Sequence, residues 1–225
     1  MSKMETHPSP IKHFKISCRY NNVLSIFDAY ELSNLLRRLG YDIVKPLPPP
    51  RYGVRVGFSG IIAQKQGRVL VDGNSDKGVI GVFSRDPLLA IREFIDIEEA
   101  IKKDIRIDLK PYFYEVLVEA EVYTDENPLK VLSNIGEKTS IIKDLSKVVK
   151  NISLFGLRLS RKNQNPDSVE WLDIQVLPSV VRADKAYFIS IVYRSKDREN
   201  VANFGEKILE YITGLINCIE SHGSE

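Results

Sequence analysis

The sequence contains few of the residues on which catalysis and metal binding most often depend. It has three histidines and two cysteines in 225 residues. Cys18 and Cys218 lie near opposite ends of the chain and match no metal-ligand spacing, so we expect two buried thiols rather than a disulfide. No Ser-His-Asp or Cys-His arrangement and no phosphate-binding loop can be recognised. The sequence therefore predicts neither a metal nor a cofactor, and it favours a protein that is not an enzyme.

Long apolar runs are also missing. No stretch approaches the roughly 18 apolar residues that a membrane span requires, and the first residues lack the apolar core of a signal peptide. We therefore expect a cytoplasmic protein without a membrane partner. Methionine and cysteine are scarce while isoleucine, lysine and glutamate are frequent, which hints at a thermophilic source, although the asparagine content argues against it.

Charge of one sign does not dominate. The chain has 32 basic and 30 acidic residues and a net charge of +2. Proteins that bind nucleic acid mainly through phosphates usually have a stronger basic bias. His7, His13 and His222 fall in or beside expected tails, and we expect them to be solvated. The hydrophobic share of 43% and the charged share of 28% are typical of a globular core under a charged surface.

The first half begins with one strand and one helix. Strict alternation of apolar and polar residues predicts a strand over 14–20. The helix is expected to begin at the N-cap Asp28 and to end at a left-handed Gly40. The proline run 46–50 then forms a stiff connector or, alternatively, a polyproline ligand for a partner. The buried helical stripe is expected to be Leu32, Leu35, Leu36 and Leu39.

Strand candidates and a second helix complete this half. The strand candidates are 52–58, 61–63 with 68–71, and 79–83. The middle pair forms either one bulged strand or a hairpin at Gln66-Gly67. Asp72-Gly73-Asn74 predicts a tight turn, since a calcium loop would need an acidic residue at the position of Phe83. Asp86-Pro87 predicts a helix start. The apolar residues of that helix are Leu88, Ile91, Phe94, Ile95 and Ile101.

The second half repeats this order. A strand is predicted over 114–123, and Asn127-Pro128 starts a helix that Gly136 interrupts. Strands are predicted at 154–159, 170–176 and 187–193. Helical spacing resumes after the interruption at Ile141, Ile142, Leu145, Val148 and Val149. The final helix has the clearest stripe: Val201, Phe204, Ile208, Leu209, Ile212, Leu215, Ile216 and Ile219.

The repeated order strand, helix, three strands, helix indicates an internal duplication. In the first half a strand runs through Phe83-Ser84-Arg85-Asp86 directly into a helix, and 187–219 does the same in the second. Over residues 12–220 this order resembles the TATA-box-binding protein family. The resemblance implies an α+β fold in which two β-α-β-β-β-α repeats, 12–108 and 109–220, share one curved antiparallel sheet with helices on one face. Residues 1–11 and 221–225 are expected to be tails. The phenylalanine pairs with which that family kinks DNA cannot be placed, so no functional residue is transferred.

The resemblance also implies that the two opening strands meet at the centre of the sheet. Lys15 and Arg19 would then face Glu115, Glu119 and Glu121, which is favourable by about 0.2–1 kcal/mol per pair. The same row of glutamates would repel the phosphates of a duplex.

The candidate binding surface combines basic residues with one aromatic residue. Trp171 is expected to face the open side of the sheet if Leu172 and Ile174 face the helices, either as a binding anchor or as an ordinary packed aromatic residue. The basic residues either contact nucleic-acid phosphates or form a solvated face. They are Lys15, Arg19, Arg37, Arg38, Arg51 and Arg55.

Three functions are compatible with this sequence. The favoured one is a non-enzymatic binding or scaffold protein whose open sheet face engages a macromolecule, either an unidentified protein partner or its own copy. The first alternative is a nucleic-acid-binding protein that uses the basic first half. The second is a small-molecule binder or an enzyme with a pocket between sheet and helices.

Overall fold

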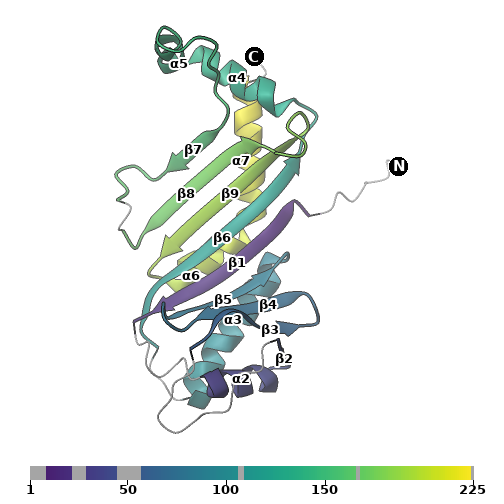
Figure 1. Cartoon of the computed structure of the whole chain (residues 1–225), viewed down its shortest axis with the longest axis vertical. Coiled ribbons are helices and arrows are strands. Elements are labelled where there is room, and N and C mark those ends of the chain that lie inside the picture. Colours follow the sequence, from purple (N-terminus) through teal and green to yellow (C-terminus); the bar gives the residue numbers. More distant parts are fainter. Residues whose placement is uncertain (1–8, 22–28, 45–56, 106–108, 166–167, 224–225) are drawn as a thin grey trace, which may run out of the picture.

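The fold is mixed α+β and contains one large, curved, open antiparallel sheet. The computed structural model describes residues 9–21, 29–44, 57–105, 109–165 and 168–223. The nine strands of this part lie in the order β2-β3-β4-β5-β1-β6-β9-β8-β7 (Figure 1). Their bounds are Ile11–Tyr20 (β1), Asp42–Ile43 (β2), Ser59–Lys65 (β3), Val69–Asn74 (β4), Val79–Ser84 (β5), Pro111–Tyr123 (β6), Leu157–Ser160 (β7), Trp171–Pro178 (β8) and Ala186–Ser195 (β9).

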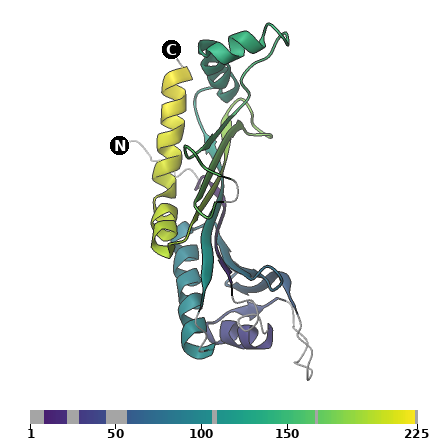
Figure 2. The same cartoon turned by 90° about the vertical axis from the view of Figure 1, so that its left-hand side faces the viewer.

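Six α-helices accompany the sheet in the described part of the chain. Figure 2 shows α3 and α7 along one face of the sheet, while the other face stays open. No helix among the described residues combines the length and apolarity needed to cross a bilayer. The helices are Ala29–Arg38 (α2), Pro87–Ala100 (α3), which continues as a π-helix over Ile101–Ile105 (η1), Pro128–Lys138 (α4), Ser140–Leu145 (α5), Arg198–Glu206 (α6) and Ile208–Gly223 (α7).

The two opening strands meet at the centre, as predicted. β1 pairs with β6 over its whole length, with Ile16 opposite Val116 and Phe14 opposite Val118. On either side of this pair the strands follow in matching order, β5-β4-β3 on one side and β9-β8-β7 on the other. The sheet is therefore continuous across the two halves, while the duplication of the sequence stays a prediction.

Alternation along each strand decides which face the helices cover. In β1 the side chains of Phe14, Ile16 and Cys18 are fully buried, and the residues between them point to the open side. Helix α6 approaches closely because residue 205 is glycine. A Cβ atom there would lie 2.9 Å from side-chain atoms of Phe14 and Ile91, closer than packed carbon atoms tolerate.

Several predicted caps and turns are confirmed. Asp86 caps α3 by accepting a hydrogen bond from the Leu89 N–H at 3.2 Å, and Asn127 caps α4 in the same way. Gly40 follows α2 with a φ of +83°, and the chain turns between β3 and β4 at Gln66-Gly67. The candidate cap Asp28, the proline run 46–50 and residues 52–56 of the predicted strand lie outside the described residues.

The predicted turn at Asp72-Gly73-Asn74 is wrong. These residues form the end of β4, and the turn follows at 75–78, where Gly78 has a φ of +65°. Neighbouring strands hold the segment extended, since Asp72 lies opposite Ile61 on one side and Gly81 on the other. Pairing on both sides outweighs the local turn preference of the sequence.

Other elements differ from the predictions in their ends or their exposure. Leu88 of the predicted α3 stripe is 62% exposed, because the buried side of α3 begins at Ala90 and Ile91 and does not include position 88. The final helix is two helices that meet at Lys207, and α7 continues to Gly223 through the expected tail. His13 lies within β1 and His222 within α7. Both cysteines are free, but only Cys18 is buried.

Candidate binding site on the open sheet face

The helices cover one face of the sheet, and the open face nevertheless carries apolar side chains at its centre. One row across the strands runs through Phe83, Lys15, Leu117, Val192 and Asp173, which lie opposite one another in neighbouring strands. All five residues are half-buried. The open face of an antiparallel sheet is normally polar. Apolar residues in its middle therefore make the open face a candidate binding surface.

Trp171 lies on this face, as predicted. It is opposite Arg194 of β9, while Leu172 is opposite Tyr193, whose ring stacks on Phe204 of α6. Leu172 therefore faces the helices and Trp171 the open side. Trp171 is the one tryptophan of the chain and is half-buried, which leaves part of its ring available to a partner.

Beside Trp171, an arginine is held in a fixed position. The Arg194 guanidinium lies 4.2 Å from the centre of the Phe113 ring, and its Nε donates to Glu115 Oε2 at 2.9 Å. The ring and the carboxylate hold this long side chain against the sheet. Trp171, Arg194 and Phe113 thus form a preformed aromatic and cationic cluster on the open face, at the end of the sheet where β8 begins and β9 ends.

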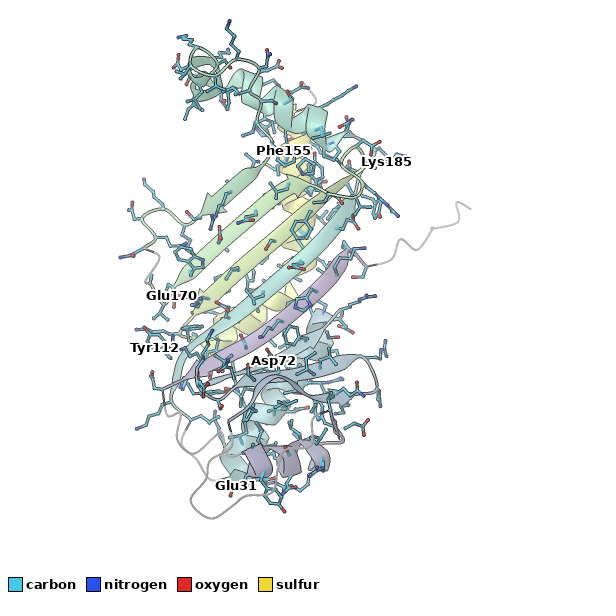
Figure 3. All side chains as sticks on the ribbon, viewed as in Figure 1. Glu31, Asp72, Tyr112, Phe155, Glu170 and Lys185 are labelled. Carbon is cyan, nitrogen blue, oxygen red and sulfur yellow. The ribbon has the colours of Figure 1, made fainter. Side chains whose placement is uncertain are left out.

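An ion pair on the open face joins β1 to β4, across the strand β5 that lies between them. Lys15 Nζ of β1 lies 2.7 Å from Asp72 Oδ2 of β4 and 4.6 Å from the centre of the Phe83 ring, although β5 runs between the two strands. Figure 3 shows where Asp72 lies on the sheet. The pair passes over Gly81, where a Cβ atom would collide with both side chains. Glycine at this position therefore permits the ion pair.

Carboxylates near the edges of the face are also paired. Arg158 makes two hydrogen bonds to Asp173, at 2.9 and 2.8 Å, and Asp173 raises the pKa of that guanidinium. Hydrogen bonds from Ser179 and then from Lys12 lower the pKa of Glu121. Positive and negative charges on the face thus largely cancel, which leaves little net attraction for phosphates.

The structure places the predicted surface residues in separate regions. Lys15, Arg19 and Trp171 share the open face, where Arg19 lies 5.4 Å from the centre of the Tyr112 ring. Arg37 and Arg38 lie at the end of α2, far from the sheet centre (Figure 1), with Arg37 bonded to Asn34 and Arg38 to Asp104. Arg51 and Arg55 lie outside the described residues.

The predicted facing of basic and acidic residues across β1 and β6 is wrong. The register places Lys15 opposite Leu117 and Arg19 opposite Phe113. The glutamates have other partners: Glu115 pairs with Arg194 of β9, and Glu121 pairs with Lys12 of β1. One basic–acidic contact thus crosses the central strand pair, but it involves neither Lys15 nor Arg19.

Buried polar groups support the strands from the helix side. Glu98 of α3 is 1% exposed, accepts a hydrogen bond from the Tyr20 hydroxyl at 2.6 Å and pairs with Arg198 of α6 at 3.3 Å. Burial raises the pKa of Tyr20 and of neighbouring Cys18. A neutral, buried thiol is a poor nucleophile, so this network has a structural role.

Sequence patterns alone missed the residues that complete the face. The sequence patterns did not single out Arg194, Phe113 or Val192. Alternation along β9 was the available signal for Val192, because its chain neighbour Ile191 is buried and Val192 must then face the open side. The described part of the chain contains no group of three His, Cys, Asp or Glu side chains that could hold a metal ion. Comparison with protein-family models and with curated protein sequences gave no match.

Proposed function

We propose that this chain is a non-enzymatic binding protein that engages another protein, or a second copy of itself, through the open face of its sheet. The observation that carries the proposal is the central row of Phe83, Leu117 and Val192, half-buried beside Trp171 on a face that no helix of the described residues covers. Tryptophan and arginine are the residues most enriched where a few contacts supply most of the binding energy.

The charges on this face favour a protein partner over nucleic acid. Lys15 and Arg194 are already paired with Asp72 and Glu115. A duplex would have to displace these carboxylates to reach the cations, which costs electrostatic energy. A protein partner can instead cover the apolar row and leave these ion pairs intact.

Site-specific photo-crosslinking tests the proposal. A photoreactive residue at Gln175, on the open face beside the apolar row, should give a discrete crosslinked product in extracts of the source cells or in the concentrated pure protein. The product would have the mass of two chains if the partner is a second copy. The control position is Leu209, which is 43% exposed on α7. Equal products at both positions, or none at Gln175, would contradict the proposal.

Nucleic acid is the second candidate, supported by exposed Arg19 and Arg37, which have no carboxylate partner in the described part of the chain. Fluorescence anisotropy of a labelled duplex over a range of salt concentrations distinguishes nucleic-acid binding from the proposed protein binding. Binding that weakens steeply with salt would favour this candidate, because phosphate contacts release counterions.

A further inference from the structure

A hollow of about 740 Å³ lies at the margin of the open face, where β1, β4 and β5 reach the start of α3. Leu70 and Phe83 lie opposite each other on β4 and β5 and contribute its apolar lining. The His13 ring lies 4.8 Å from the Phe83 ring, tilted by 58°. The volume falls within the range of roughly 300–1,000 Å³ that is usual for small-molecule sites.

Cations dominate the charged lining of this hollow. Lys12, Arg68 and Arg85 line it, and Asp86 is its one carboxylate. Asp86 already serves as the cap of α3, through its hydrogen bond from the Leu89 N–H. Within the described residues, Arg68 and Arg85 have no carboxylate within ion-pair distance. Lys12 is paired with Glu121, as Lys15, Arg158 and Arg194 are paired elsewhere on the face, so the two arginines are the unpaired cations of the lining.

The two unpaired arginines indicate which anion fits. A guanidinium offers a planar set of donors that matches the oxygens of a phosphate in a two-point contact. The capping carboxylate occupies the first turn of α3, so the side-chain cations and not the helix end supply the positive charge. The aromatic and aliphatic lining beside them suits a planar ring.

We infer that this hollow binds a small phosphorylated ligand that carries a planar ring. The phosphate lies against Arg68 and Arg85, beside the ion pair of Lys12 with Glu121, and the ring lies against Phe83 and Leu70. A nucleic-acid backbone fits less well, because the next cation along the sheet, Lys15, is neutralised by Asp72. The inference goes beyond the proposed protein-binding function and does not depend on it.

Calorimetric titration with two probes, pyrophosphate and ADP, tests the inference. We expect ADP to bind with a Kd below about 1 mM, and more tightly than pyrophosphate because only ADP has a ring. The double variant Arg68→Gln/Arg85→Gln should weaken both probes by roughly tenfold or more. Phe83→Leu should weaken ADP and leave pyrophosphate unchanged.

The control is Arg37→Gln/Arg38→Gln, which removes two exposed arginines from α2 and alters net charge by the same amount. It should leave both affinities unchanged. Circular dichroism establishes that each variant is folded. Absence of binding by the wild-type chain at about 10 mM of either probe, or equal weakening in the two double variants, would overturn the inference. Neither result would affect crosslinking from Gln175, which tests the proposed protein-binding function separately.

Discussion

The two faces of the central strands differ in how deeply their side chains are buried, although alternate residues of the same strands form both faces. On the covered face, Phe14, Ile16 and Val116 are fully buried under the helices. On the open face, Lys15 and Leu117 remain half-buried, and Lys15 contacts Asp72 and the Phe83 ring. The difference indicates that stability resides mainly on the covered face, and the open face is the one that we propose to bind a partner.

The largest effect is expected from paired truncations on the two faces. Phe14→Ala removes a fully buried ring and should lower the free energy of unfolding by about 3–5 kcal/mol. Leu117→Ala, on the neighbouring strand but on the open side, should lower it by about 1 kcal/mol or less. Chemical denaturation measures both. Similar losses in the two variants would show that the faces share the stability equally.

The strand alternation that underlies this comparison was readable from the sequence, and the open-face contacts were not. The pattern at 14–20 and 114–123 predicted two strands with one apolar side each, and the caps Asp86 and Asn127 are local signals. The pair between Lys15 and Asp72 depends on the strand order β4-β5-β1, which brings together residues 57 positions apart. The same pairing turned a local turn signal at Asp72-Gly73-Asn74 into strand.

Gly81 offers a second way to perturb only the open face. Gly81→Ala would place a methyl group against Lys15 and Asp72 and force their ion pair apart, so we expect a loss of about 1–3 kcal/mol. Gly214→Ala in α7 is the control. Its Cβ would meet no atom within 4 Å, and the change should stabilise the helix by up to about 1 kcal/mol. Thermal unfolding of both variants gives the comparison, and an unaffected Gly81→Ala variant would contradict the described ion pair.

An acidic group on the helix side should make stability depend on pH. Burial opposes ionisation of Glu93, but hydrogen bonds from Tyr41 at 2.7 Å and Lys65 at 2.9 Å outweigh burial and lower its pKa. Because the folded pKa lies below the ordinary value of 4.5, ionised Glu93 stabilises the protein above that pH. This stability is lost as the pH falls through the folded pKa.

Glu93→Gln should therefore reduce stability at pH 7 by about 1–2 kcal/mol and by less at pH 3. Urea denaturation at several pH values measures the difference. Glu99→Gln, at an exposed neighbouring position, is the control and should change stability by less than Glu93→Gln does at pH 7. A Glu93→Gln effect that grows on acidification would contradict the described interactions.

The smallest effect on stability is expected at Trp171, the residue that we propose as the anchor for the partner. Trp171→Ala should change the free energy of unfolding by about 1 kcal/mol or less but abolish the crosslinked product formed from Gln175. Leu209→Ala on α7 should leave the product intact. If Trp171→Ala destabilises the protein as strongly as Phe14→Ala, Trp171 belongs to the core and not to a binding face.

The single tryptophan permits the most direct test of whether the open face binds a partner. Chain labelled with 5-fluorotryptophan has one ¹⁹F resonance, from position 171 on the open face. We predict that this resonance shifts or broadens when the labelled chain is placed in source-cell extract, or concentrated until light scattering detects association, and that it loses its sensitivity to solvent D₂O. An unchanged, solvent-sensitive resonance in a sample where sedimentation shows the chain to be fully bound would contradict binding through the open face.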